Sequence, residues 1–307
     1  MLKDPALTAA VGEVMHRAGV TDGGDLRELD ASGLGITSLD GIGELTGLRR
    51  LRLSDNNIRD LRPLAELTGL TGLFLADNAI DDLRPLSGLT GLPALDLSGN
   101  AINGLEPLAA MTCLTWLDAS RNPLAHADGV ADLAFLTRLS LDRTGLEELP
   151  RLGRTSRLRS LSAGENRLTS LEPLVSVTSL RTLNIRANAI SDVRHLSTLG
   201  NLRSLDLSEN PINDLSPLAD LRQLHTLYVW CGLLTDLTPL RGLTGLVELG
   251  LADNFVTDVE ALAGLDHLDV LFLGGNTALG EAPLDADHVA TIADFRGPHW
   301  RDHARTD

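Results

Sequence analysis

Aromatic residues and cysteines are both scarce in this chain. Aromatic side chains make up 3% of the 307 residues, whereas hydrophobic residues make up 43%, so a core must be aliphatic and each aromatic position is informative. The two cysteines, Cys113 and Cys231, fall at different phases of the sequence repeat described below, and we do not expect them to face each other. This excludes a fold held together by disulfides.

Basic charge is also in deficit, with 26 Lys and Arg residues against 42 Asp and Glu residues and a net charge of −16. Because an acidic chain repels phosphate groups, we expect no nucleic acid and no membrane among its partners. Lys3 is the only lysine, and a composition rich in arginine, alanine and glycine is typical of a GC-rich bacterial genome.

Long apolar segments are absent. The first residues, Met1–Pro5, include an acid and a proline where a secretory signal needs an unbroken apolar run, and no stretch has the length needed to span a membrane. We therefore predict a cytoplasmic protein, with secretion by a route that needs no signal peptide as the alternative.

The sequence does contain a repeat of 22 residues. A leucine recurs at this interval from Leu26 to Leu268, and a second leucine follows each of them three residues later, from Leu29 to Leu271. The unit reads Leu-x-x-Leu-x-Leu-x-x-Asn-x-Ile-x-Asp-Leu-x-Pro-Leu-x-x-Leu-Thr-Gly. Twelve consecutive units without an insertion indicate a repeat architecture rather than separate globular domains.

Each unit combines two patterns. The Leu-x-Leu segment alternates with the period of a strand, and the segment from Asp through Pro to the last Leu has the spacing of a short helical turn. One unit cannot bury its apolar face alone, so we expect units to stack and their strands to pair in parallel at about 4.8 Å. The predicted fold class is α/β, a right-handed leucine-rich-repeat solenoid (horseshoe) with a parallel β-sheet on its concave side, short 3-10 turns on its convex side and helical caps.

An asparagine occupies the ninth position in nine of the units. A side-chain amide at this point can satisfy backbone groups that the turn leaves unpaired, in its own repeat and in the next one. We therefore assign the asparagines a structural role. Thr144 and Gly232 interrupt this ladder, and we interpret both as irregularities that the repeat tolerates, with a functional kink as the alternative.

The ends of a solenoid need covers. Asp4 and Pro5 open an amphipathic segment that stops at Gly19, which predicts a capping helix. A second apolar pattern in residues 287–296 predicts another cap. We divide the chain into an N-terminal helical cap (1–25), twelve 22-residue repeats (26–279), and a C-terminal cap and tail (280–307).

These features resemble the leucine-rich-repeat proteins of the 22-residue class, which includes bacterial internalins and the SDS22-type regulators of protein phosphatase 1. The resemblance to internalins is closest in the N-terminal half, where the helical cap is followed by the segments 20–26, 29–39 and 53–58. Both groups are non-enzymatic binders that hold a protein partner on the concave strand face. The resemblance implies the same role here.

Strand alternation predicts which residues face such a partner. If both leucines of Leu-x-Leu point inward, the residues between and beside them point out of the concave side. Exposed aromatic residues at repeat-defined positions favour binding over packing. Five of the nine aromatic residues fall on this face: Phe74, Trp116, Tyr228, Trp230 and Phe272.

The five aromatic residues form two predicted clusters. Phe74 and Trp116 lie two repeats apart and make one small apolar patch. The second cluster is Tyr228, Trp230 and Phe272, which lie on either side of the small residues Gly250 and Ala252. We therefore expect a slot, in which large aromatic side chains flank a base of small residues.

Arginines gather on the same face in the middle repeats. They suit acidic groups on a partner, although a solvated face of mixed charge is the alternative, because charges at an interface rim seldom decide affinity. The residues are Arg138, Arg143, Arg159, Arg181, Arg186 and Arg203.

Motifs for catalysis or cofactor binding are absent from the sequence. We find no glycine-rich phosphate loop and no Ser, Asp and His arrangement typical of a nucleophile. His299 and His303 have the spacing of a metal pair on a helix, but no cysteine is near them. We therefore predict no enzyme, no cofactor and no metal.

The sequence thus predicts a monomeric, non-enzymatic scaffold that binds a protein partner on its concave face. Two narrower functions are alternatives, a regulatory subunit of a Ser/Thr phosphatase of the SDS22 kind and an exported, internalin-like adhesin.

Overall fold

The computed structural model describes residues 2–152 and 157–276. In these residues one α-helix, α1 (Pro5–Ala18), precedes an alternation of short strands and 3-10 helices. The strands are β1 (Glu28–Asp30), β2 (Arg50–Arg52), β3 (Gly72–Phe74), β4 (Ala94–Asp96), β5 (Trp116–Asp118), β6 (Arg138–Ser140), β7 (Ser160–Ser162), β8 (Thr182–Asn184), β9 (Ser204–Asp206), β10 (Thr226–Tyr228), β11 (Glu248–Gly250) and β12 (Val270–Phe272).

The 3-10 helices η2 to η11 lie between the strands. η1 (Gly23–Asp25) precedes β1, and the others are η2 (Ile42–Glu44), η3 (Arg62–Leu64), η4 (Arg84–Leu86), η5 (Glu106–Leu108), η6 (Asp128–Val130), η7 (Glu172–Leu174), η8 (Arg194–Thr198), η9 (Ser216–Leu218), η10 (Thr238–Gly242) and η11 (Glu260–Leu262). In η3 the carboxylate of Asp60 accepts the N–H of Arg62, and Pro63 follows, so an acid and a proline start the turn as the repeat predicts.

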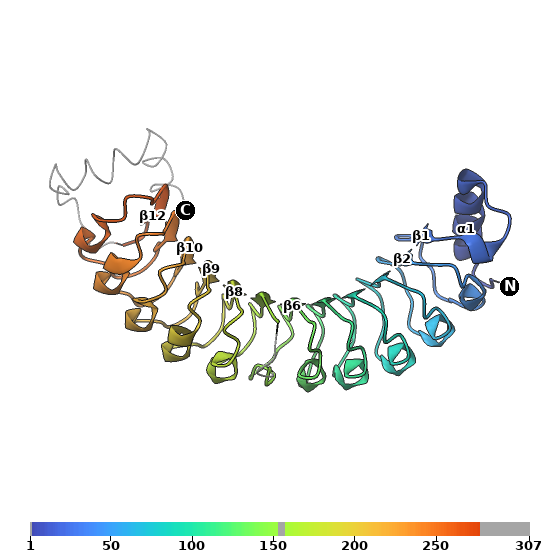
Figure 1. The fold of residues 1–307 in the computed structure, drawn as a ribbon, viewed down its shortest axis with the longest axis horizontal. Coiled ribbons are helices and arrows are strands. Elements are labelled where there is room, and N and C mark those ends of the chain that lie inside the picture. The colour runs from blue at the N-terminus through green and yellow to red at the C-terminus, as the bar shows by residue number, and fades with distance from the viewer. Residues whose placement is uncertain (1, 153–156, 277–307) are drawn as a thin grey trace. The chain divides into compact units, whose positions relative to one another are not determined.

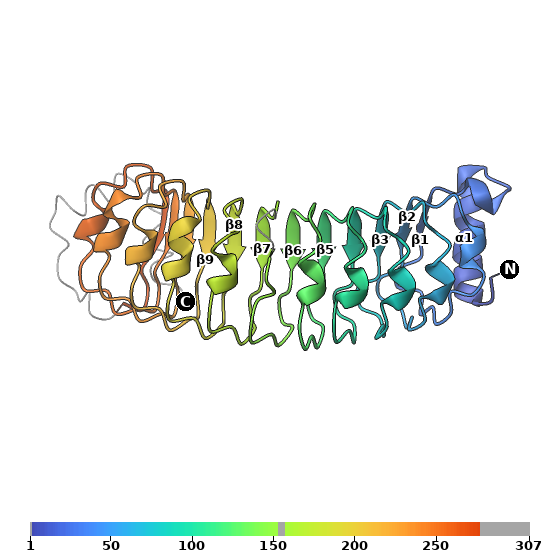
Figure 2. The same cartoon turned by 60° about the horizontal axis from the view of Figure 1, so that its bottom comes forward.

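The chain forms two compact units. Unit 1 comprises Met1–Leu146 with Pro150–Leu158, and unit 2 comprises Glu147–Leu149 with Arg159–Asp307. In unit 1 the strands β1 to β6 pair in parallel in chain order, and in unit 2 the strands β7 to β12 do the same. Within each unit the strands line one side and the 3-10 helices the other (Figures 1 and 2). We call these the sheet face and the turn side.

The register of the sheet keeps equivalent leucines side by side. Leu51 lies opposite Leu73, one repeat further on, and both are fully buried. The 3-10 helix between them contributes Leu64, which is also fully buried. Leucines from both sides of each repeat therefore meet in one aliphatic core, and the predicted leucine-rich-repeat solenoid is confirmed.

The asparagine ladder has the predicted structural role, but the side-chain amides bond to their own repeat and to the preceding one, not to the next one as we predicted. The Asn56 amide donates to the carbonyls of Leu53, in its own repeat, and of Ala31, in the preceding repeat, at 2.9 Å each. Its side-chain oxygen accepts the N–H of Ile36, also in the preceding repeat. Sequence spacing does not reveal which neighbour an amide reaches, whereas the backbone geometry fixes it.

At both breaks in the ladder, the backbone N–H that the missing asparagine would bind finds a nearby backbone acceptor instead. Before Gly232, the N–H of Ile212 donates to the backbone oxygen of Asn210 at 2.7 Å instead of to a side-chain amide. Before Thr144, the N–H of Leu124 makes the same kind of bond to Asn122, at 2.8 Å. The interpretation of tolerated irregularities fits this shared local solution.

The N-terminal helix is where the sequence predicts it. The Asp4 carboxylate caps α1, Pro5 is its first residue, and Gly19 ends it with a left-handed φ of 65°. Leu7 and Val11 are buried. The predicted C-terminal cap and the His299/His303 pair lie outside the described residues, and the division into three domains stays a prediction.

Candidate protein-binding face

The largest aromatic group on the sheet face of unit 2 is the aromatic cluster of Tyr228, Trp230 and Phe272. Trp230 is its centre, with ring centroids 5.5 Å from Tyr228 and 5.6 Å from Phe272, both in edge-on geometry. Edge-on pairs are the favourable arrangement for aromatic rings. Trp230 keeps 38% of its surface exposed, and the other two rings are half-buried.

The predicted slot between these residues is filled, which corrects the prediction. A Cβ on Gly250 would lie 1.8 Å from Nε1 of Trp230 and 2.6 Å from Cδ1 of Tyr228. The indole therefore rests on the backbone of Gly250, and the glycine supplies the room for it. The result is a preformed aromatic surface rather than an empty slot.

Carboxylates surround the aromatic cluster. Burial and a hydrogen bond with the Glu248 carboxylate raise the pKa of the Tyr228 hydroxyl. Next to Trp230, burial and the neighbouring Asp253 raise the pKa of the Cys231 thiol. Cys231 is exposed and Cys113 is also a free thiol, as predicted from their different repeat phases. An environment that opposes the thiolate gives Cys231 no nucleophilic role.

Unit 1 carries the second predicted patch. Phe74 on β3 and Trp116 on β5 are in contact, with centroids 6.0 Å apart, and both are half-buried. The Arg52 guanidinium lies 5.4 Å from the Phe74 centroid. Burial raises the pKa of Asp96, on the strand between the two rings. The structure thus brings this pair together as predicted, with a cation on its flank.

The predicted arginines have different environments. Arg186 in unit 2 donates to the Glu209 carboxylate, with Nε 3.0 Å from the oxygen, and this hydrogen bond raises the pKa of Arg186. Arg143 also has an interaction partner, so its side chain is not free. The others are exposed and make no ion pair with the described residues: Arg138 in unit 1, and Arg159, Arg181 and Arg203 in unit 2.

The sequence reasoning missed several exposed apolar residues, and two of them are related by the repeat. Leu233 and Phe255 keep 46% and 55% of their surface exposed, and they occupy the same position in consecutive repeats of unit 2. This position follows the ladder asparagine and is usually small or polar in the chain. The signal that could have identified them is a large apolar residue at a repeat position that is small or polar in most other repeats.

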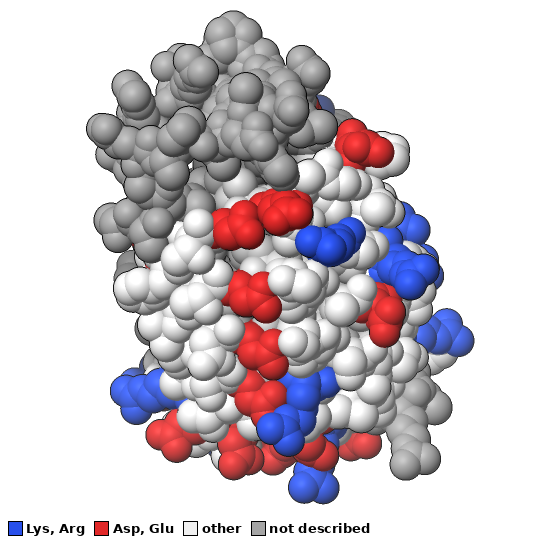
Figure 3. Space-filling view, turned by 90° about the vertical axis from the view of Figure 1, so that its left-hand side faces the viewer, with Lys and Arg blue, Asp and Glu red and all other residues white. Residues whose placement is uncertain are grey.

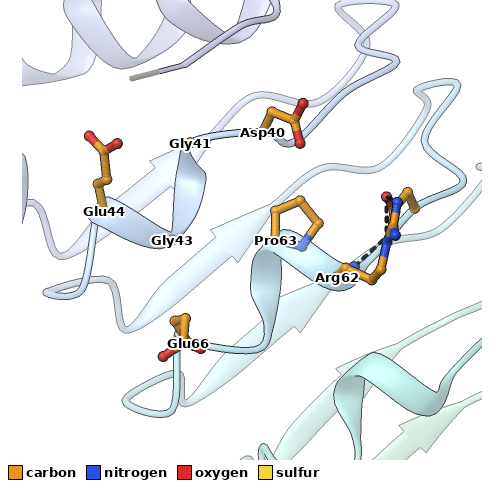
Figure 4. A pocket seen from close by; sticks show the side chains of 8 residues that line it. Asp40, Gly41, Gly43, Glu44, Arg62, Pro63 and Glu66 are labelled. Atoms are coloured by element: carbon orange, nitrogen blue, oxygen red, sulfur yellow. Dashed lines mark hydrogen bonds and ion pairs between the residues drawn. The ribbon is translucent and has the colours of Figure 1, made fainter.

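A hollow of about 500 Å³ lies on the turn side between η2 and η3 (Figure 4). Asp40, Glu44 and Glu66 line it together with the Asp60–Arg62 ion pair, and the figure shows these carboxylates spread around its rim. Asp40 is paired with Lys3 at 2.8 Å. Across residues 2–152 and 157–276, no three His, Cys, Asp or Glu side chains are arranged to hold a metal ion.

Acidic side chains form a column on the turn side of unit 2 (Figure 3). Aspartates recur there at one repeat position, and each carboxylate accepts the N–H two residues further on. These residues are Asp192, Asp214, Asp236 and Asp258. Negative charge is therefore built into the turn side as part of its structure.

None of the helices within the described part of the chain has the length and apolar character required to cross a membrane.

Stacked strand-and-turn units with an asparagine ladder define a leucine-rich-repeat protein. The family profile "Leucine Rich repeats (2 copies)" matches residues 156–198 and 200–242, and "Leucine rich repeat" matches residues 46–102. A comparison with curated protein sequences finds no match.

Solved structures give a closer likeness. An internalin (inlF) of Listeria monocytogenes is 30% identical, with 89% of this chain and 82% of that chain covered and a TM-score of 0.82. A leucine-rich-repeat protein of Leptospira interrogans is 26% identical, with 81% and 67% covered and a TM-score of 0.78. The chain belongs to the internalin class of leucine-rich-repeat proteins. Proteins with this fold generally act in protein–protein interaction and are typically non-enzymatic scaffolds.

Proposed function

We propose that the chain is a non-enzymatic scaffold that binds a protein partner on its sheet face, with the aromatic cluster of unit 2 as the main anchor. The observation that supports this most is the exposed Trp230 ring, held in place by Tyr228 and Phe272 over Gly250. Trp and Tyr residues dominate the energetics of protein interfaces, and a ring already fixed in position loses little entropy on binding.

The patch of Phe74 and Trp116 in unit 1 is the second candidate anchor. It has the same type of residues on the same face of its own unit, but Trp116 is less exposed than Trp230. We give it a supporting role in the same interaction.

Affinity capture from native cell lysate tests the proposal. The wild-type protein is compared with a Tyr228→Ala/Trp230→Ala variant, and bound proteins are identified by mass spectrometry. Phe255→Ala is the matched control, because it removes a large exposed aromatic ring of the same unit from outside the sheet face. A protein retained by wild type and by the control, and lost by the double variant, supports the proposal. Equal retention by all three contradicts it.

Two narrower roles predict different results. Co-purification of a Ser/Thr phosphatase catalytic subunit would favour the regulatory role suggested by SDS22-type proteins. The likeness to a Listeria internalin favours an exported adhesin as the other candidate. Detection of the protein in culture medium would support export, whereas detection only in the cell fraction would support the cytoplasmic scaffold.

A single species at about monomer mass in light scattering would support our proposal of a monomer.

A further inference from the structure

Three arginines form a row along the sheet face of unit 2. Arg159, Arg181 and Arg203 each stand one residue before a strand, from β7 to β9. The backbone N–H of Arg181 donates to the carbonyl of Arg159, and that of Arg203 to the carbonyl of Arg181, at 2.8 Å each. The three residues are thus in register, about one strand spacing of 4.8 Å apart. We call them the arginine row.

The charge of the arginine row is not offset by any ion pair with the described residues. All three side chains are exposed, and their guanidinium groups have no hydrogen-bond or ion-pair partner among the described residues. The residues that follow them, Ser160, Thr182 and Ser204, are uncharged. Like charges on neighbouring strands repel, so the row lowers the stability of the unit and contributes nothing visible to its packing.

The same repeat position has a structural use in unit 1. Arg27 and Arg49 donate through Nη1 to the carbonyls of Gly47 and Gly69, at 3.0 and 2.7 Å. Each guanidinium lies so close to its glycine that a Cβ there would be 2.5 Å from Nη1. In both cases the residue that accepts this hydrogen bond, twenty positions further on, is a glycine.

Unit 2 lacks those glycines. The residues twenty positions after the arginine row are Ser179, Asn201 and Gln223, and all three have a Cβ. The three guanidinium groups of the arginine row make no hydrogen bond of this kind to the described residues, and their side chains are exposed. Their presence is better explained by a ligand than by the fold.

We propose that the arginine row docks an acidic helical segment of the protein partner, an inference that rests on the proposed function. Carboxylates three or four residues apart on one face of a helix are separated by about 4.5 or 6.0 Å along its axis, values on either side of the row spacing, whereas alternate residues of an extended strand repeat at about 6.6 Å. The acidic column on the turn side repels such a segment, which favours docking on the sheet face. His225 is next in register, one residue before β10, and its N–H donates to the carbonyl of Arg203, so it lies between the row and the strand that carries Tyr228.

A defined probe tests this docking. The probe is a fluorescein-labelled, alanine-based helical peptide with glutamates at alternating steps of three and four residues, which keeps them on one face, and its partner probe has glutamine at these positions. Binding is measured by fluorescence anisotropy at about 50 mM salt, where charge pairs are weakly screened. We expect the glutamate probe to bind and the glutamine probe to bind at least about tenfold more weakly, because three exposed pairs together give about that factor.

The charge is then removed from the protein. Arg159→Gln/Arg181→Gln/Arg203→Gln is expected to weaken the glutamate probe about tenfold. Arg194→Gln/Arg222→Gln/Arg241→Gln is the matched control, since it removes three arginines of the same unit from around η8 to η10, and it should leave the affinity unchanged. No binding of the glutamate probe to wild type, or equal weakening in both triple variants, would overturn the proposal.

Two further outcomes separate the alternatives. Tighter binding of a single-stranded oligonucleotide of equal charge would overturn the acidic helix in favour of nucleic acid. Because the probe has no apolar anchor, Trp230→Ala should leave its affinity unchanged. If the captured partner depends on Trp230 while the probe does not bind, the proposed function stands and the acidic-helix inference fails. If the probe binds the row but no partner depends on the aromatic cluster, the proposed function fails instead.

Discussion

The indole of Trp230 rests directly on Gly250, where a Cβ would lie 1.8 Å from its Nε1 atom. The two residues belong to neighbouring repeats, with Gly250 in register with Tyr228 on the adjacent strand. A flat ring over a residue without a side chain makes a rigid aromatic surface, and Phe272 closes its other side. The proposed binding role depends on this pairing.

Gly250→Ala should displace the Trp230 ring while leaving the aliphatic core intact. We expect greater quenching of tryptophan fluorescence by acrylamide, because the indole must move toward solvent, together with loss of the captured partner. Gly264→Ala is the control, since a Cβ there meets nothing within 4 Å. Unchanged quenching in the Gly250 variant would contradict the described position of the ring.

Leu227→Ala should reduce the free energy of unfolding much more than Trp230→Ala. Leu227 is fully buried, and removing a buried leucine side chain costs about 2 to 5 kcal/mol through lost burial and a cavity. Trp230 is partly exposed, and each edge-on ring contact contributes only about 0.5 to 1.5 kcal/mol. Urea denaturation measures both. A larger loss from the tryptophan would show that its ring belongs to the core.

Asn210→Ala should break the ladder at a buried point. The amide donates to the carbonyls of Ile185 and Leu207, and its oxygen accepts the N–H of Ile190. Unsatisfied buried backbone groups cost about 1 to 3 kcal/mol each, so we expect a lower melting temperature. Asn103→Ala, at an exposed amide with a single contact to Pro123, should have little effect. Equal melting temperatures for the two variants would contradict a structural ladder.

The sequence predicted the inward leucines and the pairing of Phe74 with Trp116, because strand alternation and a strict repeat fix both. It did not predict that Trp230 fills its own slot, since that depends on a side-chain rotamer rather than on a spacing. Our prediction that the asparagines reach the next repeat was wrong for a similar reason. Position nine has a neighbouring repeat on each side, and the spacing does not distinguish them.

The arginines illustrate a signal that was present and not used. Arg27 and Arg181 occupy the same repeat position and look alike in a column of the repeat. Their environments differ: Arg27 donates to the carbonyl of Gly47, whereas Arg181, with Asn201 at the corresponding position, is exposed and makes no such bond to the described residues. Comparing each arginine with the residue twenty positions later, rather than with its column, separates the structural arginines from the free ones.

Asp4 should make the attachment of α1 sensitive to acid. Burial raises its pKa, but four backbone N–H groups outweigh burial and lower the pKa below its ordinary 3.8. Because the folded pKa is the lower one, the stabilisation is complete well above pH 3.8 and is lost as pH falls through the folded value. The four donors are Ala6 and Leu7 in the helix and Thr37 and Ser38 in the first repeat.

Hydrogen exchange of the α1 amides measures this effect. Protection should decrease as pH falls below the ordinary pKa of 3.8, and Asp4→Ala should reduce it at neutral pH by about 1 kcal/mol for the lost cap alone, with a smaller effect in acid. Glu13→Ala removes an exposed carboxylate paired with Arg17 on the same helix and serves as the control. If the Asp4 and Glu13 variants behave alike, the carboxylate does not tie the helix to the first repeat.

Tyr228 is the only tyrosine in the chain, so its ionisation can be followed directly by ultraviolet absorbance. Burial and the hydrogen bond with Glu248 raise its pKa above the ordinary 10.0, because both disfavour the phenolate. The unfolded chain loses this proton first, so the free energy of unfolding should fall as pH rises above about 10. Glu248→Gln should lower the pKa toward 10.0, since it removes the negative charge, whereas Glu260→Gln on the turn side should not change it. A wild-type titration centred at the ordinary value would place the hydroxyl in open solvent and remove one wall of the aromatic cluster.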